Sequence, residues 1–327
     1  MRIKKFVISN IILSIILIIV LYGLSWVYIN YVNDRTVKFM EYNKLPDNSV
    51  DIVTLGSSHG KFGIKLDKKN QMNLALEEQG MYYNLKLFEK YESKIKNGAV
   101  VIIPISIFTF YDSNIKEEIE KDERYKNYIN LLEKKDIAKN LENSQYFLIK
   151  KFSILYPPER IISSFKYLKK IIEEKNISKQ NIIYGTKKYN KEQIKKISIE
   201  TANLFSQRLD SKNSTYGLEL TKKLLEKIEK KEGKVVFIIV PLVRDYTEAM
   251  ELTENKIFKK AVYKNIEIIN KELNENILFL DYSKDKRFMD NLDYFMDDDH
   301  LNEKGAEYFT EILLKDIEKE LKNERKI

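Results

Sequence analysis

Residues 50–60 read Val50-Asp51-Ile52-Val53-Thr54-Leu55-Gly56-Ser57-Ser58-His59-Gly60, a short apolar run that ends in a glycine–serine turn. The run is rich in Val, Ile and Thr, which predicts a buried strand. A sharp turn after a strand exposes a serine hydroxyl and gathers backbone N–H groups around it. Ser58 is therefore a candidate nucleophile.

A second polar block lies far downstream at 297–305, with the sequence Asp-Asp-Asp-His-Leu-Asn-Glu-Lys-Gly. The chain has only two histidines in 327 residues, His59 in the turn and His300 in this block. Histidine suits a general base near neutral pH, and a carboxylate orients its ring. Asp297 stands three residues before His300 and can meet it within one turn. The two blocks together supply a complete Ser/His/Asp set.

Short apolar runs alternate with helical patterns along the chain, which predicts a parallel sheet covered on both faces. The expected strands are 51–55, 72–76, 99–104, 234–241 and 277–281. The expected helices are 81–96, 218–231, 256–274 and 303–322. We expect a three-layer α/β/α sandwich around a mainly parallel five-stranded sheet. Because ligands bind beyond the carboxyl ends of such strands, the two polar blocks should share one edge.

Residues 6–29 form an almost unbroken apolar run, long enough to cross a bilayer, which takes about 20 apolar residues. Arg2, Lys4 and Lys5 precede the run and favour a cytoplasmic N-terminus. The run is too long for a signal peptide, and no small-residue cleavage site follows it. The sequence therefore predicts an uncleaved single-pass anchor in a bacterial cell membrane, with the remaining chain outside the cytoplasm.

Three regions are expected along the chain. Residues 1–30 form the cytoplasmic tip and transmembrane anchor, and residues 31–48 form a spacer. Residues 49–327 form one catalytic domain. A charged, mostly helical insertion at about 113–214 separates the third and fourth strands of this domain.

The composition excludes several kinds of site. There is no cysteine, so neither a disulfide framework nor a thiolate metal site is possible. The formal net charge is +8, but lysines alternate with glutamates in stretches such as 224–232. This pattern is typical of a solvated helix face and does not indicate nucleic acid. An Asp triplet with one histidine and no second acidic cluster does not predict a metal site, and no cofactor is expected.

The motifs resemble those of the SGNH (GDSL) hydrolases. Gly56-Ser57-Ser58 is similar to the family's Gly-Asp-Ser block, and the Asp-x-x-His of 297–300 is similar to its terminal block. Residues 72–76, Met-Asn-Leu-Ala-Leu, resemble its second block. The resemblance covers about 50–110 and 234–320. It is strongest to membrane-anchored exported members that accompany polysaccharide or teichoic-acid acylation, including the DltD-like D-alanine transfer proteins.

The resemblance implies a flavodoxin-like SGNH fold, with Ser58 as nucleophile, His300 as base and Asp297 as its orienting carboxylate. Two departures concern the oxyanion hole. The second block of the family offers a glycine soon after its Asn-Leu, whereas Gly80 comes late here. The asparagine of the third block is absent, and Ser106 stands at roughly its place.

Five other polar residues are candidates for supporting roles. Asn73 can join the first and second blocks through backbone hydrogen bonds. His59 is a second proton carrier, a substrate contact or a packing residue beside the nucleophile. Arg244 follows the fourth strand and suits either an anionic substrate group or a surface ion pair. Asp298 or Asp299 could hold the imidazole if the loop is wound differently.

The sequence thus predicts a membrane-anchored serine esterase or O-acyltransferase acting outside the cytoplasm. Its partners would be an acceptor (a cell-envelope polysaccharide, teichoic acid or peptidoglycan) and an acyl donor, for which a membrane-bound O-acyltransferase is the candidate source. One alternative is a non-catalytic partner protein of such an acyltransferase, docked through the helical insertion. Another is the α/β-hydrolase fold, whose Gly-x-Ser-x-Gly elbow matches 56–60 but lies well into a larger sheet.

Overall fold

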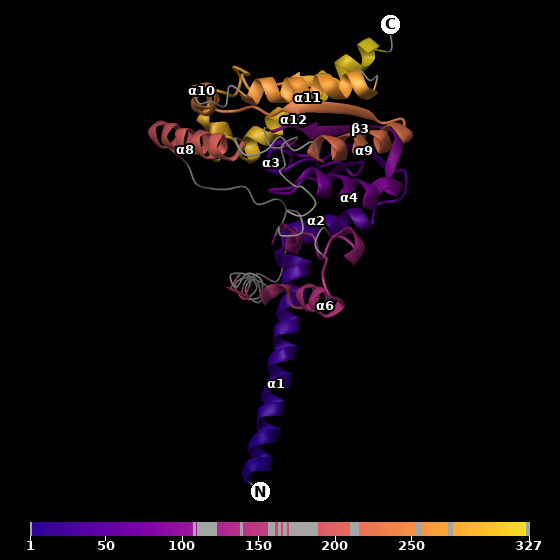
Figure 1. Cartoon of the computed structure of the whole chain (residues 1–327), viewed down its shortest axis with the longest axis vertical. Helices are drawn as coiled ribbons and strands as arrows, with labels where there is room; N and C mark the ends of the chain where they lie inside the picture. The colour runs from indigo at the N-terminus through magenta and orange to yellow at the C-terminus, as the bar shows by residue number, and fades with distance from the viewer. Residues whose placement is uncertain are drawn as a thin grey trace. The chain divides into compact units, whose positions relative to one another are not determined.

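The computed structural model describes residues 2–106, 109, 123–137, 140–155, 189–209, 216–252, 257–273 and 277–324, with four further positions between 161 and 169. The chain divides into two compact units (Figure 1). The first comprises Met1–Lys44 and Ile119–Ile183, and the second comprises Leu45–Glu118 and Tyr184–Ile327.

The first unit is built on a long apolar helix, α1 (Arg2–Val27). A π-helical turn (Tyr28–Val32) and a second helix, α2 (Asp34–Asn43), follow it. Among the described residues, this N-terminal segment is the one helix long and apolar enough to cross a membrane. Its apolar side chains are largely exposed, as a lipid-facing helix requires. The predicted spacer therefore contains a helix, α2.

Helix α2 begins where the sequence allows a cap. Asn33 precedes it in an extended conformation, and its side-chain oxygen accepts a hydrogen bond from the N–H of Arg35 at 3.1 Å. Asparagine is among the preferred residues at this position because it satisfies an unpaired N–H of the first turn.

The rest of the first unit consists of short elements. The described ones are η3 (Glu123–Asn127), η4 (Lys134–Asp136), α6 (Asn143–Lys151) and η5 (Ser153–Leu155). Both α6 and η5 pack on α1, and α6 is seen beside it in Figure 1.

The second unit is a five-stranded sheet in the order β2-β1-β3-β4-β5, with every neighbouring pair parallel. The strands are β1 (Val50–Thr54), β2 (Gln71–Asn73), β3 (Ile95–Pro104), β4 (Lys234–Ile239) and β5 (Leu278–Asp281). Its described helices are α3 (Ser58–Gly63), α4 (Met81–Tyr91), α8 (Lys191–Leu209), α9 (Tyr216–Lys230), α10 (Arg244–Leu252), α11 (Ile257–Leu273) and α12 (Glu303–Glu324). With helices on both faces of the sheet, the predicted α/β sandwich is confirmed.

The central strands β3 and β4 carry buried apolar residues at consecutive positions, as in Ile102-Ile103 and Val236-Phe237-Ile238. Consecutive side chains of a strand point to opposite faces, so both faces of this sheet are covered. Helix α4 packs against α9, and α3 packs against α12. These contacts hold α3, which carries Ser58, against the C-terminal helix.

Three element boundaries differ clearly from the prediction. The second strand ends at Asn73 rather than 76, because the Asn73 side chain accepts a hydrogen bond from the N–H of Ala75 at 3.0 Å and turns the chain. The helix expected over 81–96 ends at Tyr91, and β3 begins at Ile95, which pairs with Val50 ahead of a register shift.

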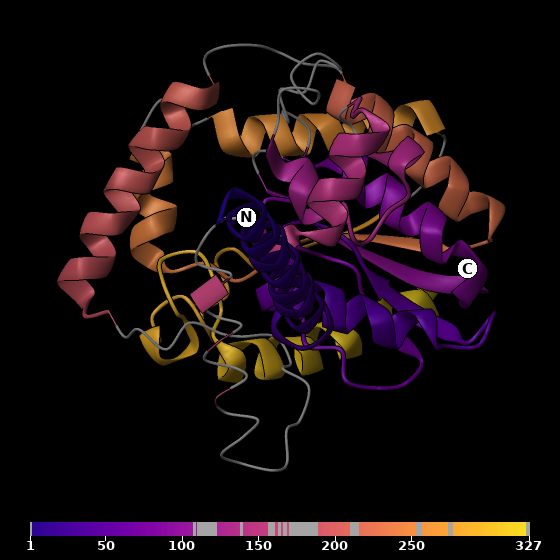
Figure 2. The same ribbon diagram turned by 90° about the horizontal axis from the view of Figure 1, so that it is seen from below.

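The expected insertion at 113–214 is divided between the two units. Residues 119–183 group with the N-terminal helix, whereas α8 belongs to the second unit and lies beside α10 (Figure 2). Residues 110–122, 138–139, 156–160, 170–188 and 210–215, which include much of this predicted helical segment, lie outside the described residues.

Candidate active site

The turn after β1 requires a glycine. Gly56 has φ +108°, a conformation that side chains other than glycine rarely adopt. A Cβ added there would also lie 3.2 Å from Cδ of Pro104. The N–H of Gly56 donates to the side-chain oxygen of Asn84 at 2.6 Å. Helix α3 then starts with Ser58 as its first residue.

Helix α3 is held tightly against the carboxyl edge of the sheet. A Cβ on Gly60 would lie 2.6 Å from the carbonyl oxygen of Leu55 and 2.7 Å from Cβ of Ala75. The buried Asn73 amide donates to the carbonyls of Gly60 and Ile64 at 2.9 and 2.8 Å. Asn73 therefore ties the end of β2 to the helix that carries Ser58.

Asn84 is a structural residue of the site that sequence reasoning missed. Its side-chain oxygen accepts from the Gly56 N–H and from Nε2 of Gln79, each at 2.6 Å. Its Nδ2 donates to the carbonyl of Gly80 at 3.2 Å. The available signal was a polar residue at i−4 from Phe88, on the apolar face of the predicted helix.

The acidic block forms a tight loop before α12. The Met296 N–H donates to the carbonyl of His300 at 3.0 Å, and the His300 N–H donates to Oδ1 of Asp297 at 2.7 Å. Gly305 closes the loop, since a Cβ there would lie 2.2 Å from the carbonyl oxygen of Tyr294. The backbone itself therefore places the carboxylate of Asp297 beside the ring of His300.

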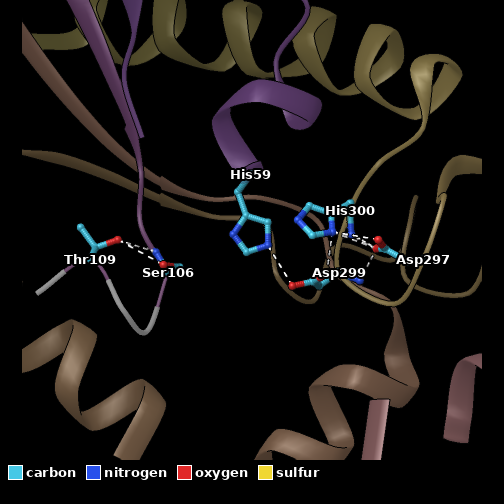
Figure 3. A network of polar contacts seen from close by, with 6 residues as sticks. All are labelled: His59, Ser106, Thr109, Asp297, Asp299 and His300. Atoms are coloured by element: carbon cyan, nitrogen blue, oxygen red, sulfur yellow. Dashed lines mark hydrogen bonds and ion pairs between the residues drawn. The ribbon is translucent and has the colours of Figure 1, made fainter. Parts of the chain in front are cut away.

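Two carboxylates converge on one nitrogen of His300 (Figure 3). Its Nδ1 lies 2.9 and 3.0 Å from the oxygens of Asp297 and 2.8 Å from Oδ1 of Asp299. Its Nε2 is buried and has no hydrogen-bond partner within the described part of the chain. The arrangement fixes the ring at Nδ1 and leaves Nε2 available for another group.

The carboxylates set the protonation of the loop. Burial opposes the charged imidazole, but the charge of Asp299 and hydrogen bonds to Asp297 and Asp299 raise the pKa of His300 well above its usual value. Burial would raise the pKa of Asp299, yet the charges and hydrogen bonds of His300 and His59 hold it far below its usual range. Burial, followed by the charges of Asp299 and Asp297, raises the pKa of Asp298 to about 7.

Helix α3 faces this loop through two of its side chains. The His59 ring lies 5.2 Å from the His300 ring, and its Nε2 is 3.3 Å from Oδ2 of Asp299. The Phe62 ring meets His300 edge-on at 5.8 Å. Ser58 precedes His59 and stands four residues before Phe62, so it lies on the side of α3 that faces His300.

The Ser58 hydroxyl makes no hydrogen bond within the described residues. The serine–histidine contact of a triad is therefore not formed between Ser58 and His300 in this structure. Ser58 is half-buried, and His300 has one-fifth of its side chain exposed. Both side chains are therefore partly exposed, although Nε2 of His300 itself is buried.

The remaining candidates lie at the same edge, because they follow parallel strands. Gly80 precedes α4, and its carbonyl accepts from Asn84. Ser106 follows β3, and its N–H donates to the hydroxyl of Thr109 at 2.9 Å. Arg244 begins α10 and forms a two-point ion pair with Asp290 at 2.6 and 2.7 Å. That contact is the surface ion pair, one of the two interpretations of Arg244.

The clustered ligand-type groups form a carboxylate–imidazole network. His59, Asp299 and His300 each offer one ligand atom within 4.8 Å of the others. Each oxygen of Asp299 already faces an imidazole nitrogen, one from each histidine. We therefore describe the cluster by these contacts and assign no metal to it.

No protein-family model and no curated protein sequence matches the chain. Twelve chains of solved structures match it. One is the crystal structure of a protein from Bacteroides fragilis described as a "putative acylhydrolase". It is 12% identical, with a TM-score of 0.38, and the match covers 86% of this chain and 94% of that chain. A likeness at this TM-score supports no inference about activity.

Proposed function

We propose that the second unit is a serine acyl-transfer enzyme of the esterase or O-acyltransferase type, with Ser58 as nucleophile and His300 as general base. The observation that carries the proposal is the set of contacts around the His300 ring. Two carboxylates hold its Nδ1, its Nε2 is buried without a partner, and the helix beginning at Ser58 packs against it.

The roles follow from the two ring nitrogens. With the proton on Nδ1 directed at the carboxylates, Nε2 carries the lone pair that takes the proton of the Ser58 hydroxyl. Asp297 and Asp299 share the single Nδ1 proton and stabilise the imidazolium that forms. Two carboxylates around one imidazole also mean that His300 must lose a proton before it can act as a base.

The oxyanion needs preorganised N–H donors. The Ser58 N–H, at the start of α3, is the first candidate. Gly80 and Ser106 are further candidates, but the Ser106 N–H is already satisfied by Thr109. The Ser106 hydroxyl lies 3.4 Å from the Thr109 hydroxyl and is therefore a better oxyanion donor than the Ser106 N–H.

In the proposed reaction, Oγ of Ser58 attacks an ester carbonyl carbon while Nε2 of His300 takes the hydroxyl proton. The alcohol leaves with that proton, and an acyl-enzyme remains. Water or a sugar hydroxyl then gives its proton to His300 and attacks the acyl carbon. Water as acceptor makes an esterase, and a sugar hydroxyl makes a transferase.

Two features support a substrate of the cell envelope. The N-terminal helix is long and apolar enough to tether the enzyme to a membrane. Tethering raises the local concentration of a membrane-derived acyl donor. The resemblance of the Ser58 and His300 motifs to exported SGNH members supports an envelope polysaccharide, teichoic acid or peptidoglycan as acceptor.

The alternative is a non-catalytic partner of a membrane-bound O-acyltransferase, and one observation favours it: Ser58 and His300 are not hydrogen-bonded. A fluorophosphonate probe separates the two functions. The full chain in detergent micelles should be labelled, and Ser58→Ala should lose the label, whereas Ser57→Ala keeps it. Turnover of 4-nitrophenyl acetate should fall by about 10³-fold or more in Ser58→Ala, and His300→Ala should add little to that loss. Absence of labelling in the folded parent chain would refute the enzyme.

A further inference from the structure

We propose that His59 is a positioning residue for the proposed reaction. Its ring nitrogen faces the second oxygen of Asp299, so that this carboxylate is held between the two imidazoles and His300 stays available as a base. The proposal rests on the proposed function only for its catalytic consequence, because the contact itself is a property of the fold.

The geometry is that of a shared carboxylate (Figure 3). Oδ1 of Asp299 lies 2.8 Å from Nδ1 of His300, and Oδ2 lies 3.3 Å from Nε2 of His59. The Asp299 and His59 side chains are each 13% exposed, so water screens these contacts weakly. The only two histidines of the chain therefore meet on one buried carboxylate.

No other described group competes for Asp299. The other charged or titratable groups near Asp299 are Asp297 and Asp298 of the same loop and the buried Tyr246 of α10. None of them brings a positive charge. The buried ammonium of Lys61, one turn along α3, pairs instead with Glu77 at 3.5 Å. Among the described residues, His59 is thus the one group besides His300 that stabilises the charged form of Asp299.

A base in this position needs such a contact. Two carboxylates on Nδ1 favour the imidazolium form of His300, which cannot accept the serine proton. A donor on Oδ2 of Asp299 weakens the hold of that carboxylate on His300. The ring nitrogen of His59 lies 3.3 Å from Oδ2, close enough for a hydrogen on that nitrogen to attract the carboxylate oxygen. Removing His59 should therefore raise the pKa of His300 further.

The chain has only two histidines, so replacing one of them leaves the nuclear magnetic resonance signals of the other. In the full chain labelled with ¹³C and ¹⁵N at histidine, in micelles, His59→Leu and His59→Gln each leave one histidine spectrum, that of His300. Its wild-type signals are identified by their loss in His300→Gln. We expect the His300 titration to move upward by roughly 0.5 to 1 pH unit in His59→Leu. Gln retains an N–H donor, so His59→Gln should move less.

The activity measurement separates the acid limb of the pH profile from its alkaline plateau. In His59→Leu the acid limb of kcat/KM for 4-nitrophenyl acetate should move by the same amount, with little change in the alkaline plateau. A His300 titration that stays within about 0.2 pH unit, or moves downward, would overturn the proposal. The histidine titration is measured without any enzymatic turnover. If the chain fails to react with a fluorophosphonate, the proposed enzymatic function is refuted, but the titration still tests the role of His59.

A separate observation concerns the first unit. We further propose that α6 lies on the outer surface of the lipid bilayer and inserts Phe147 and Leu148 into it. These side chains are 56% and 53% exposed, and they share one face of the helix with Lys151. A short helix with large apolar side chains outward and lysines at its end is typical of a membrane-interface element.

The contacts of α6 with α1 determine the depth of α6 relative to the bilayer. Directly after α6, Phe152 packs against Tyr22 of α1 with ring centroids 6.3 Å apart, and the Ile154 N–H donates to the Ser25 hydroxyl at 3.4 Å. Counting about 20 residues of membrane span from Phe6 brings the chain to Ser25. The contact therefore falls where α1 leaves the hydrocarbon core.

The absence of cysteine makes the test clean. Phe147→Cys and Gln145→Cys each introduce one thiol for a fluorescent label, at exposed positions on roughly opposite sides of α6. In phosphatidylcholine vesicles, a nitroxide on the upper acyl chain should quench the label at position 147 several-fold more than the label at 145. Aqueous iodide should show the reverse order. Equal iodide quenching at both positions, with no lipid quenching at 147, would overturn the proposal.

Discussion

Replacing Asn84 by leucine should destabilise the second unit through the turn that carries Ser58. Leucine has the branched shape of asparagine but a larger volume, so the buried position also gains some overpacking. What is lost are the acceptor for the Gly56 N–H and for Nε2 of Gln79, each at 2.6 Å, and the donor to Gly80. Asn84 is 3% exposed, so water cannot replace these partners.

The magnitude follows from the donors left behind. A buried donor without a partner costs about 1–3 kcal/mol, and two such donors remain in Asn84→Leu. Burial of the leucine side chain offsets about 1–2 kcal/mol. The free energy of unfolding should fall by about 2–4 kcal/mol. For a unit of roughly 200 residues this corresponds to a drop of about 5–15 °C in melting temperature.

The assay is thermal unfolding of the full chain in micelles, followed by far-ultraviolet circular dichroism. Asn70→Leu is the matched control, because the Asn70 amide donates to Asp51 at a half-buried site where water can take over. Its melting temperature should change by about 2 °C or less. If Asn84→Leu melts together with Asn70→Leu, the amide does not hold the turn and the reasoning fails.

Four further outcomes are expected. Gly60→Ala should lower the melting temperature and the rate of fluorophosphonate labelling, since its Cβ would meet the Leu55 carbonyl at 2.6 Å; Gly23→Ala, with no atom within 4 Å, should not. Because the pKa of His300 is raised, kcat/KM should climb with pH and level off only on the alkaline side, and a flat profile from pH 5 would contradict the assignment. The stability that His300 gains from its carboxylates should be complete below about pH 6.5 and be lost as pH rises through the raised pKa, as denaturation at several pH values would show. Arg244→Ala should leave melting and ester turnover unchanged, because its ion pair with Asp290 is exposed; a loss of turnover alone would give Arg244 a substrate contact.

The sheet was predictable because its signal is local. Each strand is a short apolar run between polar segments, and the period of the helices is visible in the sequence alone. The ends of the elements depended on distant partners instead. The chain leaves β2 at Asn73 because that side chain turns the backbone, and β3 starts at Ile95 because Val50 is available to pair with it.

The site was partly predictable for the same reason. Ser58 stands in a strand–turn motif, and Asp297 is close enough in sequence to reach His300 within one turn. The second carboxylate on Nδ1, that of Asp299, was one of several readings of the loop, because the winding of the loop decides it. The link from Asn84 to the Gly56 turn spans 28 residues and is set by packing, which periodicity does not reveal.

The insertion was the least predictable region. The apolar residues of its described helices α6 and α8 are not confined to one face, so their pattern does not indicate which surface they cover. The structure places α8 beside α10 in the second unit and groups residues 119–183 with the N-terminal helix. That division depends on tertiary contacts between segments far apart in sequence.

The pairing of α3 with α12 has a consequence for the timing of assembly. The Lys65 N–H donates to the Thr310 hydroxyl at 2.8 Å across 245 residues, and the Lys65 ammonium pairs with Glu303 at 2.8 Å. A ribosome synthesises Ser58, the proposed nucleophile, long before His300, the proposed base, so the growing chain carries the serine for a long time without the histidine. Contacts of such long sequence separation form slowly, and segments that await them are open to misassembly. The packing of α3 against α12 therefore completes the second unit and, in the same step, brings Ser58 and His300 together.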